Sequence, residues 1–130
     1  MSKEAAKLTS KQQAILRVFE DAEQPITTQD AWDVARGEVP GLGIATVYRA
    51  VKSLVDDGLL RTVELVGQVP RYESARKGHL HHFFCRECSS VFDIGDCPSG
   101  LKSLVPDGFQ MEDHSIVLYG LCKDCRAAKA

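Results

Sequence analysis

Long apolar stretches are missing from this 130-residue sequence, although 44% of its residues are hydrophobic. No run of about 18 apolar residues is present, so a membrane-spanning helix is not expected. Residues 1–5 also lack the apolar core of a secretory signal peptide. We therefore expect a cytoplasmic protein.

An excess of positive charge is missing as well, since 16 Lys and Arg residues are outnumbered by 18 Asp and Glu residues. The composition therefore carries no general signature of nucleic-acid binding, and any DNA-binding surface has to be local. The chain is long enough for one domain or for two small ones. Two small domains would each bury little apolar surface, which favours a metal ion or a partner subunit as additional support.

The first half of the chain has the periodicity of helices. Pro25 separates two of them, and residues 27–30 resemble a capping box that starts the second helix at Thr27 or Thr28. A third helix is predicted from Gly43 to Asp57. The residues expected on the inner face are Leu8, Ile15, Val18, Phe19 and Ala22 of the first helix and Val47, Val51, Leu54 and Val55 of the third, while Ala31, Trp32, Val34 and Ala35 follow the capping box in the second.

Two extended apolar stretches, residues 59–66 and 69–72, predict a β-hairpin around Gly67. Three short helices followed by a hairpin is the order of a winged-helix DNA-binding domain. The outer side of the third helix leaves five residues for a DNA major groove, and basic residues on flanking elements are candidates for the DNA backbone. These candidates are Ala45, Thr46, Tyr48, Arg49 and Lys52 on the helix, and Lys11, Arg61 and Arg71 around it. Taken alone, this signal is weak, because an exposed Tyr-Arg pair on a helix usually marks only a solvated face.

A short polar segment that ends in glycine, residues 74–78, is the predicted hinge between two domains. We expect an N-terminal DNA-binding domain over residues 1–73 and a small α/β domain over residues 79–130. In the second domain, strands are predicted at 80–85, 90–94 and 115–121, with a short helix at 98–104. The predicted fold class is α+β.

Two CxxC pairs stand 33 residues apart, formed by Cys85 with Cys88 and by Cys122 with Cys125. Four thiolates close a tetrahedral site, which is the structural arrangement of zinc. A redox dithiol is the competing interpretation, and unconnected buried cysteines are the third. The repeated spacing favours a structural zinc site.

Three of the four histidines lie within residues 79–82. On a strand, His79 and His81 share one face, so we predict them as two ligands of a second metal, with His114 as a third and Asp96 or Cys97 as a fourth. On the opposite face, His82 could meet Glu73 and Asp93 in a more oxygen-rich set. Cys97 has three interpretations: a soft ligand that favours zinc, a redox-active thiol, or a small buried residue.

A zinc hydrolase or deaminase would combine histidine and CxxC in a related way, but it needs a general base and a Pro-Cys-x-x-Cys pair. Residue 81 is His where that base would be Glu, and Phe84 precedes Cys85. We therefore do not expect an enzyme. A zinc-stabilised protein-interaction module without DNA binding is the other class of function that the sequence allows.

Four segments together resemble the ferric-uptake-regulator family in order and spacing: residues 43–49, 71–73, 81–88 and 114–122. The resemblance implies a homodimer that binds palindromic double-stranded operator DNA when a sensing site holds metal, usually as a repressor of metal-uptake or stress genes. It also implies three metal sites. These are Cys85, Cys88, Cys122 and Cys125 for structural zinc, His79, His81 and His114 for one further site, and Glu73, His82 and Asp93 for the other.

The chain departs from the family pattern at three positions. Pro25 and Leu80 stand where many members place histidines of the interdomain sensing site, and Ser89 replaces a glycine that usually follows the second knuckle cysteine. The oxygen-rich site is thus incomplete, which favours zinc at the nitrogen-rich site and the zinc-uptake branch of the family. An iron-, manganese- or peroxide-responsive member is the alternative.

Overall fold

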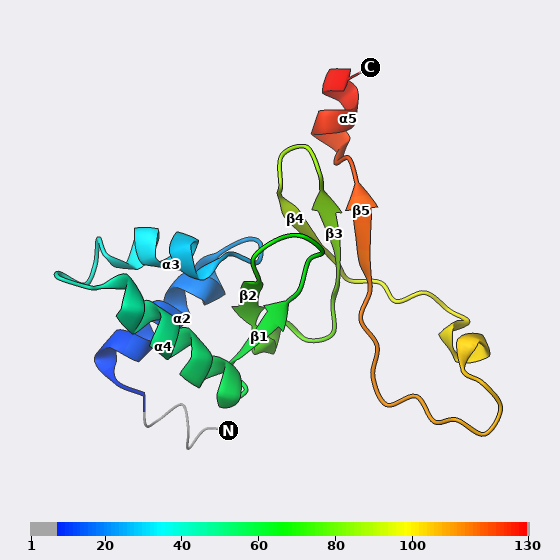
Figure 1. Ribbon diagram of the computed structural model, residues 1–130, viewed down its shortest axis with the longest axis horizontal. Helices are drawn as coiled ribbons and strands as arrows, with labels where there is room; N and C mark the ends of the chain where they lie inside the picture. The colour runs from blue at the N-terminus through cyan, green and yellow to red at the C-terminus, as the bar shows by residue number, and fades with distance from the viewer. Residues whose placement is uncertain (1–7, 130) are drawn as a thin grey trace. The chain divides into compact units, whose positions relative to one another are not determined.

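The computed structural model describes residues 8–129, which form two compact units that divide between Gly78 and His79 (Figure 1). The expectation for residues 1–5 lies outside this part of the chain. The first unit is mainly helical and the second is built on a small sheet, so the α+β class is confirmed. None of the described helices is long and apolar enough to cross a membrane.

The first unit begins with three helices, α2 (Ser10–Asp21), α3 (Thr28–Ala35) and α4 (Ile44–Asp56). The predicted capping box of α3 is confirmed: the Thr27 hydroxyl accepts from the Asp30 amide at 3.0 Å, and the Asp30 carboxylate accepts from the Thr27 amide at 3.1 Å. Such bonds satisfy amides that have no partner within the helix. The helix α4 begins at Ile44, one residue after the predicted start at Gly43, and Gly43 is its N-cap.

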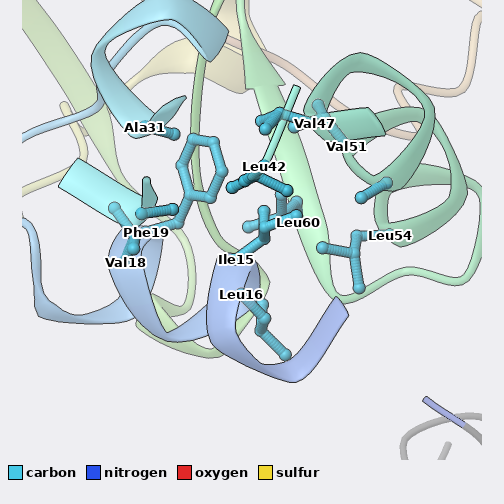
Figure 2. Close-up of a cluster of buried hydrophobic side chains, with 12 residues drawn as sticks. Ile15, Leu16, Val18, Phe19, Ala31, Leu42, Val47, Val51, Leu54 and Leu60 are labelled. Atoms are coloured by element: carbon cyan, nitrogen blue, oxygen red, sulfur yellow. The ribbon is translucent and has the colours of Figure 1, made fainter. Parts of the chain in front are cut away.

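The three helices enclose one apolar core, and most of its members lie on the faces that the periodicity predicts (Figure 2). Ile15 and Phe19 of α2 meet Val47 and Leu54 of α4, and all four are fully buried. Val34, which follows the predicted capping box of α3, is 55% exposed. The helix α3 has only eight residues and packs through Ala31 and Ala35, whereas Val34 lies beside that line.

A hairpin of β1 (Leu60–Val63) and β2 (Arg71–Ser74) completes the winged-helix order. Both strands are shorter than predicted, because Val66 and Val69 lie outside the ladder and are 81% and 65% exposed. The predicted hinge contains a 3-10 turn, η1 (Ala75–Lys77). The Ala75 amide donates to the Leu59 carbonyl at 3.0 Å, which fastens the start of this segment to the first unit.

The second unit is a three-stranded sheet in the order β4-β3-β5, formed by β3 (His81–Cys85), β4 (Val91–Ile94) and β5 (Val117–Gly120) (Figure 1). β3 pairs with β4 antiparallel and with β5 parallel. Parallel pairing requires a long connection, and residues 95–116 supply it. Its only described helical turn is η2 (Leu101–Leu104), shorter than the predicted helix, and the C-terminal helix α5 (Lys123–Lys129) was not predicted.

Candidate metal centres and DNA-binding surface

The strand directions of the second unit bring metal-ligand side chains together at both ends of its sheet. β3 and β5 begin at one end, where β4 finishes, and the histidines His79, His81 and His114 lie there. β3 and β5 finish at the other end, where the four cysteines of the CxxC pairs lie. The two clusters are separated by the length of β3, about 13 Å for a five-residue strand.

The four cysteine sulfurs of the CxxC pairs all lie within 4.8 Å of one another. The Cys88 and Cys122 sulfurs are 3.9 Å apart. Zinc–sulfur bonds of about 2.3 Å in a tetrahedron place neighbouring sulfurs roughly 3.8 Å apart. The geometry therefore fits a four-coordinate zinc ion, and the cluster resembles a structural zinc site.

Backbone amides prepare this cysteine cluster for a cation. The Cys88 amide, together with that of Cys122, donates to Cys85 Sγ and lowers the pKa of the Cys85 thiol to about 6, although burial acts in the opposite direction. Hydrogen bonding with the Cys122 thiol, together with burial, raises the pKa of Cys125 to about 12. Four crowded sulfurs cannot all ionise by themselves, whereas a divalent cation compensates their charge.

A second cluster contains His79, His81, Cys97 and His114, whose ligand atoms also lie within 4.8 Å of one another. His79 Nε2 is 3.1 Å from Nε2 of His81 and 3.1 Å from Nε2 of His114. Cys97 Sγ is 3.2 Å from His114 Nε2 and 3.5 Å from His81 Nε2. Zinc–nitrogen bonds of about 2.0–2.1 Å place the ligands of a tetrahedral site roughly 3.3–3.6 Å apart, so these atoms fit such a site.

Ordinary hydrogen bonding does not explain the convergence of these rings. One Nε2 atom of a neutral imidazole carries either a proton or a lone pair, so His79 Nε2 cannot bond well to two ring nitrogens at once. Burial lowers the pKa of His81, which is 2% exposed, and the charges of His79, His114 and His82 lower it further. His81 is therefore held in the neutral form that binds metal.

The two candidates for the fourth ligand lie differently in the structure. Cys97 belongs to the histidine cluster, whereas Asp96 is not among the clustered ligands of the described residues. The sequence alone could not separate them, because both follow β4 in the same loop. The choice depends on where the chain turns after Ile94.

The oxygen-rich set divides between the two units. His82 and Asp93 face each other across β3 and β4, with 3.6 Å between Nε2 and Oδ1. Glu73 belongs to β2 of the first unit, where its Oε2 accepts from Arg61 Nε at 2.8 Å. Sequence analysis missed this ion pair, although the hairpin register that places Arg61 opposite Glu73 would have predicted it.

The outer face of α4 carries the expected DNA-reading residues. Ala45, Tyr48, Arg49 and Lys52 are exposed, and Tyr48 is 57% exposed. Thr46 is half-buried and accepts from Arg49 Nη2 at 3.2 Å. The face therefore presents two cations and an aromatic ring to solvent.

The flanking basic residues have different surroundings. Lys11 is exposed and shares a surface hollow with Thr46 and Arg49, so it extends the positive face of α4. Arg71 starts β2, is half-buried and lies opposite Val63. Arg61 differs from the expectation, since its guanidinium is engaged by Glu73 and by the Gly78 carbonyl.

The sequence matches the model of the Ferric uptake regulator family over residues 3–119. It is 31% identical over 102 residues to the transcriptional regulator FurA of Mycobacterium tuberculosis, covering 75% of this chain and 69% of that one. It is 28% identical over 130 residues to the zinc uptake regulation protein of the same species, covering 98% of this chain and 100% of that one. The ferric uptake regulator of Francisella tularensis, solved with iron, superposes with a TM-score of 0.79 and 27% identity, over 92% of this chain and 94% of that one.

Proposed function

The chain belongs to the ferric uptake regulator family of metal-responsive, DNA-binding transcription regulators, and we propose that it is a zinc-dependent repressor that binds palindromic operators as a homodimer. The regulated genes are those of metal uptake or homeostasis, and the site of action is the cytoplasm, where the operators are. Members of this family are transcription regulators and not enzymes.

The structural metal in this proposal is a zinc ion held by Cys85, Cys88, Cys122 and Cys125. The first pair follows from the end of β3, and the second lies at and after the end of β5. An ion there joins two distant segments of the chain, since Cys88 and Cys122 are 34 positions apart in the sequence. Its role is to stabilise a unit too small to depend on apolar burial alone.

The sensed metal is zinc, and the observation that supports this most strongly is the convergence of three imidazoles and one thiol at His79, His81, His114 and Cys97. A nitrogen-rich tetrahedral set with one soft sulfur suits zinc, whereas manganese and ferrous iron favour more oxygen ligands and higher coordination numbers. The mycobacterial relative named as a zinc uptake regulator supports the same choice.

The DNA-binding surface in this proposal is the outer face of α4, with Tyr48 and Arg49 at the base edges and Lys52, Lys11 and Arg71 at phosphates. Local charge matters because the whole chain carries a net charge of −2. A homodimer presents two such faces to two half-sites, which explains why a palindrome is the expected target.

The dimer in this proposal forms through the second unit. β5 is an edge strand of the described sheet, so its free backbone groups can pair with the same strand of a second copy. Phe83, Phe92 and Leu118 lie side by side across the three strands. Phe92 and Leu118 are 44% and 49% exposed, which gives the dimer an apolar surface to bury.

Metal and operator act on one equilibrium. If zinc and DNA both favour the same arrangement of the dimer, each raises the affinity for the other by the same factor. A tenfold change in operator affinity needs about 1.4 kcal/mol of coupling.

The experiment is a fluorescence-anisotropy titration of a DNA fragment from the region upstream of the protein's own gene. The protein starts with only its structural zinc, and Zn(II) is added at buffered free concentrations. Parallel titrations use Fe(II) or Mn(II) without oxygen. Zinc is expected to tighten specific binding at least tenfold, at free concentrations lower than either other ion requires.

If only iron or manganese tightened binding, that metal would be the sensed signal in place of zinc, and the conclusion that the protein is a metal-dependent regulator would stand. Absence of specific binding under every metal condition, with other candidate promoters also tested, would indicate the zinc-stabilised interaction module. In that case replacement of Tyr48 and Arg49 by alanine would leave the protein's interactions unchanged.

A further inference from the structure

The Arg61 side chain bonds to strand β2 and to Gly78, at the end of the segment that follows β2. Arg61 stands opposite Glu73 in the β1–β2 register, and its Nε donates to Glu73 Oε2 at 2.8 Å. Its Nη1 donates to the carbonyl of Gly78, the last residue of the unit. One guanidinium thus links strand β2 to the end of residues 75–78.

This pairing changes what Glu73 can do. The family resemblance places Glu73 among the ligands of an oxygen-rich metal site, but its carboxylate already accepts a charge-assisted hydrogen bond from a part-buried cation. A divalent ion at the same carboxylate would meet the positive charge of Arg61 at short range, and the repulsion disfavours its binding. Glu73 as the structure has it, paired with Arg61, does not fit as a ligand of a resident divalent ion.

Two sequence departures agree with this conclusion independently. Pro25 and Leu80 stand where many family members have histidines of that site, and neither side chain can ligate a metal. The chain therefore has no nitrogen donor at these two positions, and the glutamate is paired with a cation.

We propose that Arg61 is a resident cation that takes the place of a divalent ion at Glu73. It holds β2 and Gly78 together whether or not metal is present. The oxygen-rich set consequently binds no metal, and the sensed ion is bound by His79, His81, Cys97 and His114 alone. This inference rests on the proposed function for its regulatory meaning, but the metal content that tests it is independent of DNA binding.

The test uses Mn(II) as the probe, added to full-length protein already saturated with zinc, and bound Mn(II) is measured by the loss of the free-ion EPR signal. Wild type is expected to bind no Mn(II) in the micromolar range. Arg61→Met is expected to gain close to one equivalent, and the double variant Arg61→Met/Glu73→Gln to lose it again. Arg61→Lys retains a positive charge and should exclude Mn(II), while Arg71→Met removes another arginine of the same hairpin and should also behave as wild type.

Two outcomes would overturn the inference. One is a wild-type protein that binds Mn(II) or a third zinc ion through Glu73, seen as a lower metal content in Glu73→Gln. The other is an Arg61→Met protein that keeps native Trp32 fluorescence and still binds no Mn(II). If Arg61→Met does not fold, the wild-type comparison with Glu73→Gln decides, and equal metal content supports the inference. Failure of the proposed function would show separately, as absent operator binding with these metal counts unchanged.

Discussion

Cys97 is the single residue that decides the chemistry of the second metal cluster. Its sulfur lies 3.2–3.9 Å from the Nε2 atoms of His114, His81 and His79, so it completes a set of four ligands. With Co(II) in this cluster and zinc kept in the four-cysteine cluster, a bound thiolate gives sulfur-to-metal charge-transfer absorption in the near ultraviolet. We expect Cys97→Ser to remove that absorption and to weaken zinc at this site by more than the roughly 10- to 100-fold typical of lost outer-sphere partners.

Asp96→Asn is the matched control for Cys97→Ser, because it changes the neighbouring candidate in the same loop. It should leave both the absorption and the zinc affinity as in wild type. A Cys97→Ser protein with unchanged Co(II) spectra, or an Asp96→Asn protein with weakened zinc, would assign the fourth position to Asp96.

Ser89 shows a strained backbone at the first cysteine knuckle. Its φ is +63°, in the left-handed region that favours glycine, and it is the only described non-glycine residue with a positive φ. Its amide closes the turn by donating to the Cys85 carbonyl at 2.8 Å. We expect Ser89→Gly to raise the stability of the zinc-loaded protein by up to about 1 kcal/mol, since glycine adopts this conformation without steric cost.

Thermal unfolding of the zinc-loaded protein measures this effect, with Ser89→Val as the opposing variant. A β-branched residue is poorly accommodated at positive φ, so its melting temperature should fall below that of wild type. A Ser89→Gly protein less stable than Ser89→Val would refute the account of strain.

At the scale of elements, the exposed face of α4 carries the residues proposed to read the operator. Arg49→Ala should reduce operator affinity by about 1–3 kcal/mol per half-site while leaving the melting temperature within about one degree. Anisotropy and thermal unfolding measure the two quantities. Arg17→Ala, which removes an equal charge from the exposed side of α2, is the control and should leave specific affinity nearly unchanged. Equal losses in both variants would indicate a nonspecific charge effect.

The helices were predictable because their signals are local. The capping box at Thr27 and Asp30 and the apolar spacing of α2 and α4 depend on residues only a few positions apart. The 55% exposure of Val34 could not be read from the sequence, because burial on α3 depends on how this helix packs against its neighbours, which no local pattern encodes. Strand ends were overestimated for the same reason, since Val66 and Val69 are apolar yet have no partners in the ladder.

The metal clusters were predictable to different extents. The CxxC spacing predicted the four cysteines that cluster, and strand alternation paired His79 with His81. The order of the sheet could not be read from the chain, because β5 reaches β3 in parallel after a connection with almost no regular structure. The choice of Cys97 over Asp96 depends on where the chain turns after Ile94, whereas the Arg61–Glu73 pair follows from the register of the β1–β2 hairpin.

At the scale of the whole molecule, the two units depend on different forces. The first has an apolar core, whereas the second has a small sheet with cysteine ligands at one end and histidine ligands at the other. Trp32 is the chain's single tryptophan and belongs to the first unit, where its Nε1 donates to the Leu42 carbonyl at 2.8 Å. Its fluorescence therefore reports on the first unit alone.

We expect a strong chelator under reducing conditions to unfold the second unit and leave Trp32 emission native. Loss of strand signal in circular dichroism and loss of the dimer in light scattering should accompany zinc release. The substitution of Cys122 by serine should reproduce this result without chelator. A simultaneous red shift of Trp32 emission would mean that the two units unfold together.

The connection between β4 and β5 leaves the sheet just before Cys97 and returns at His114, so its two ends are ligands of the same cluster. Three large apolar side chains on this excursion, Leu104, Phe109 and Met111, are exposed and are the kind of residue at which many proteases cleave. A metal ion bound at both ends of this connection restricts its motion and slows its cleavage by proteases. Under the proposed function, zinc scarcity would shorten the lifetime of the protein as well as weaken its binding to the operator, so that the level of the regulator and its affinity for DNA would fall together.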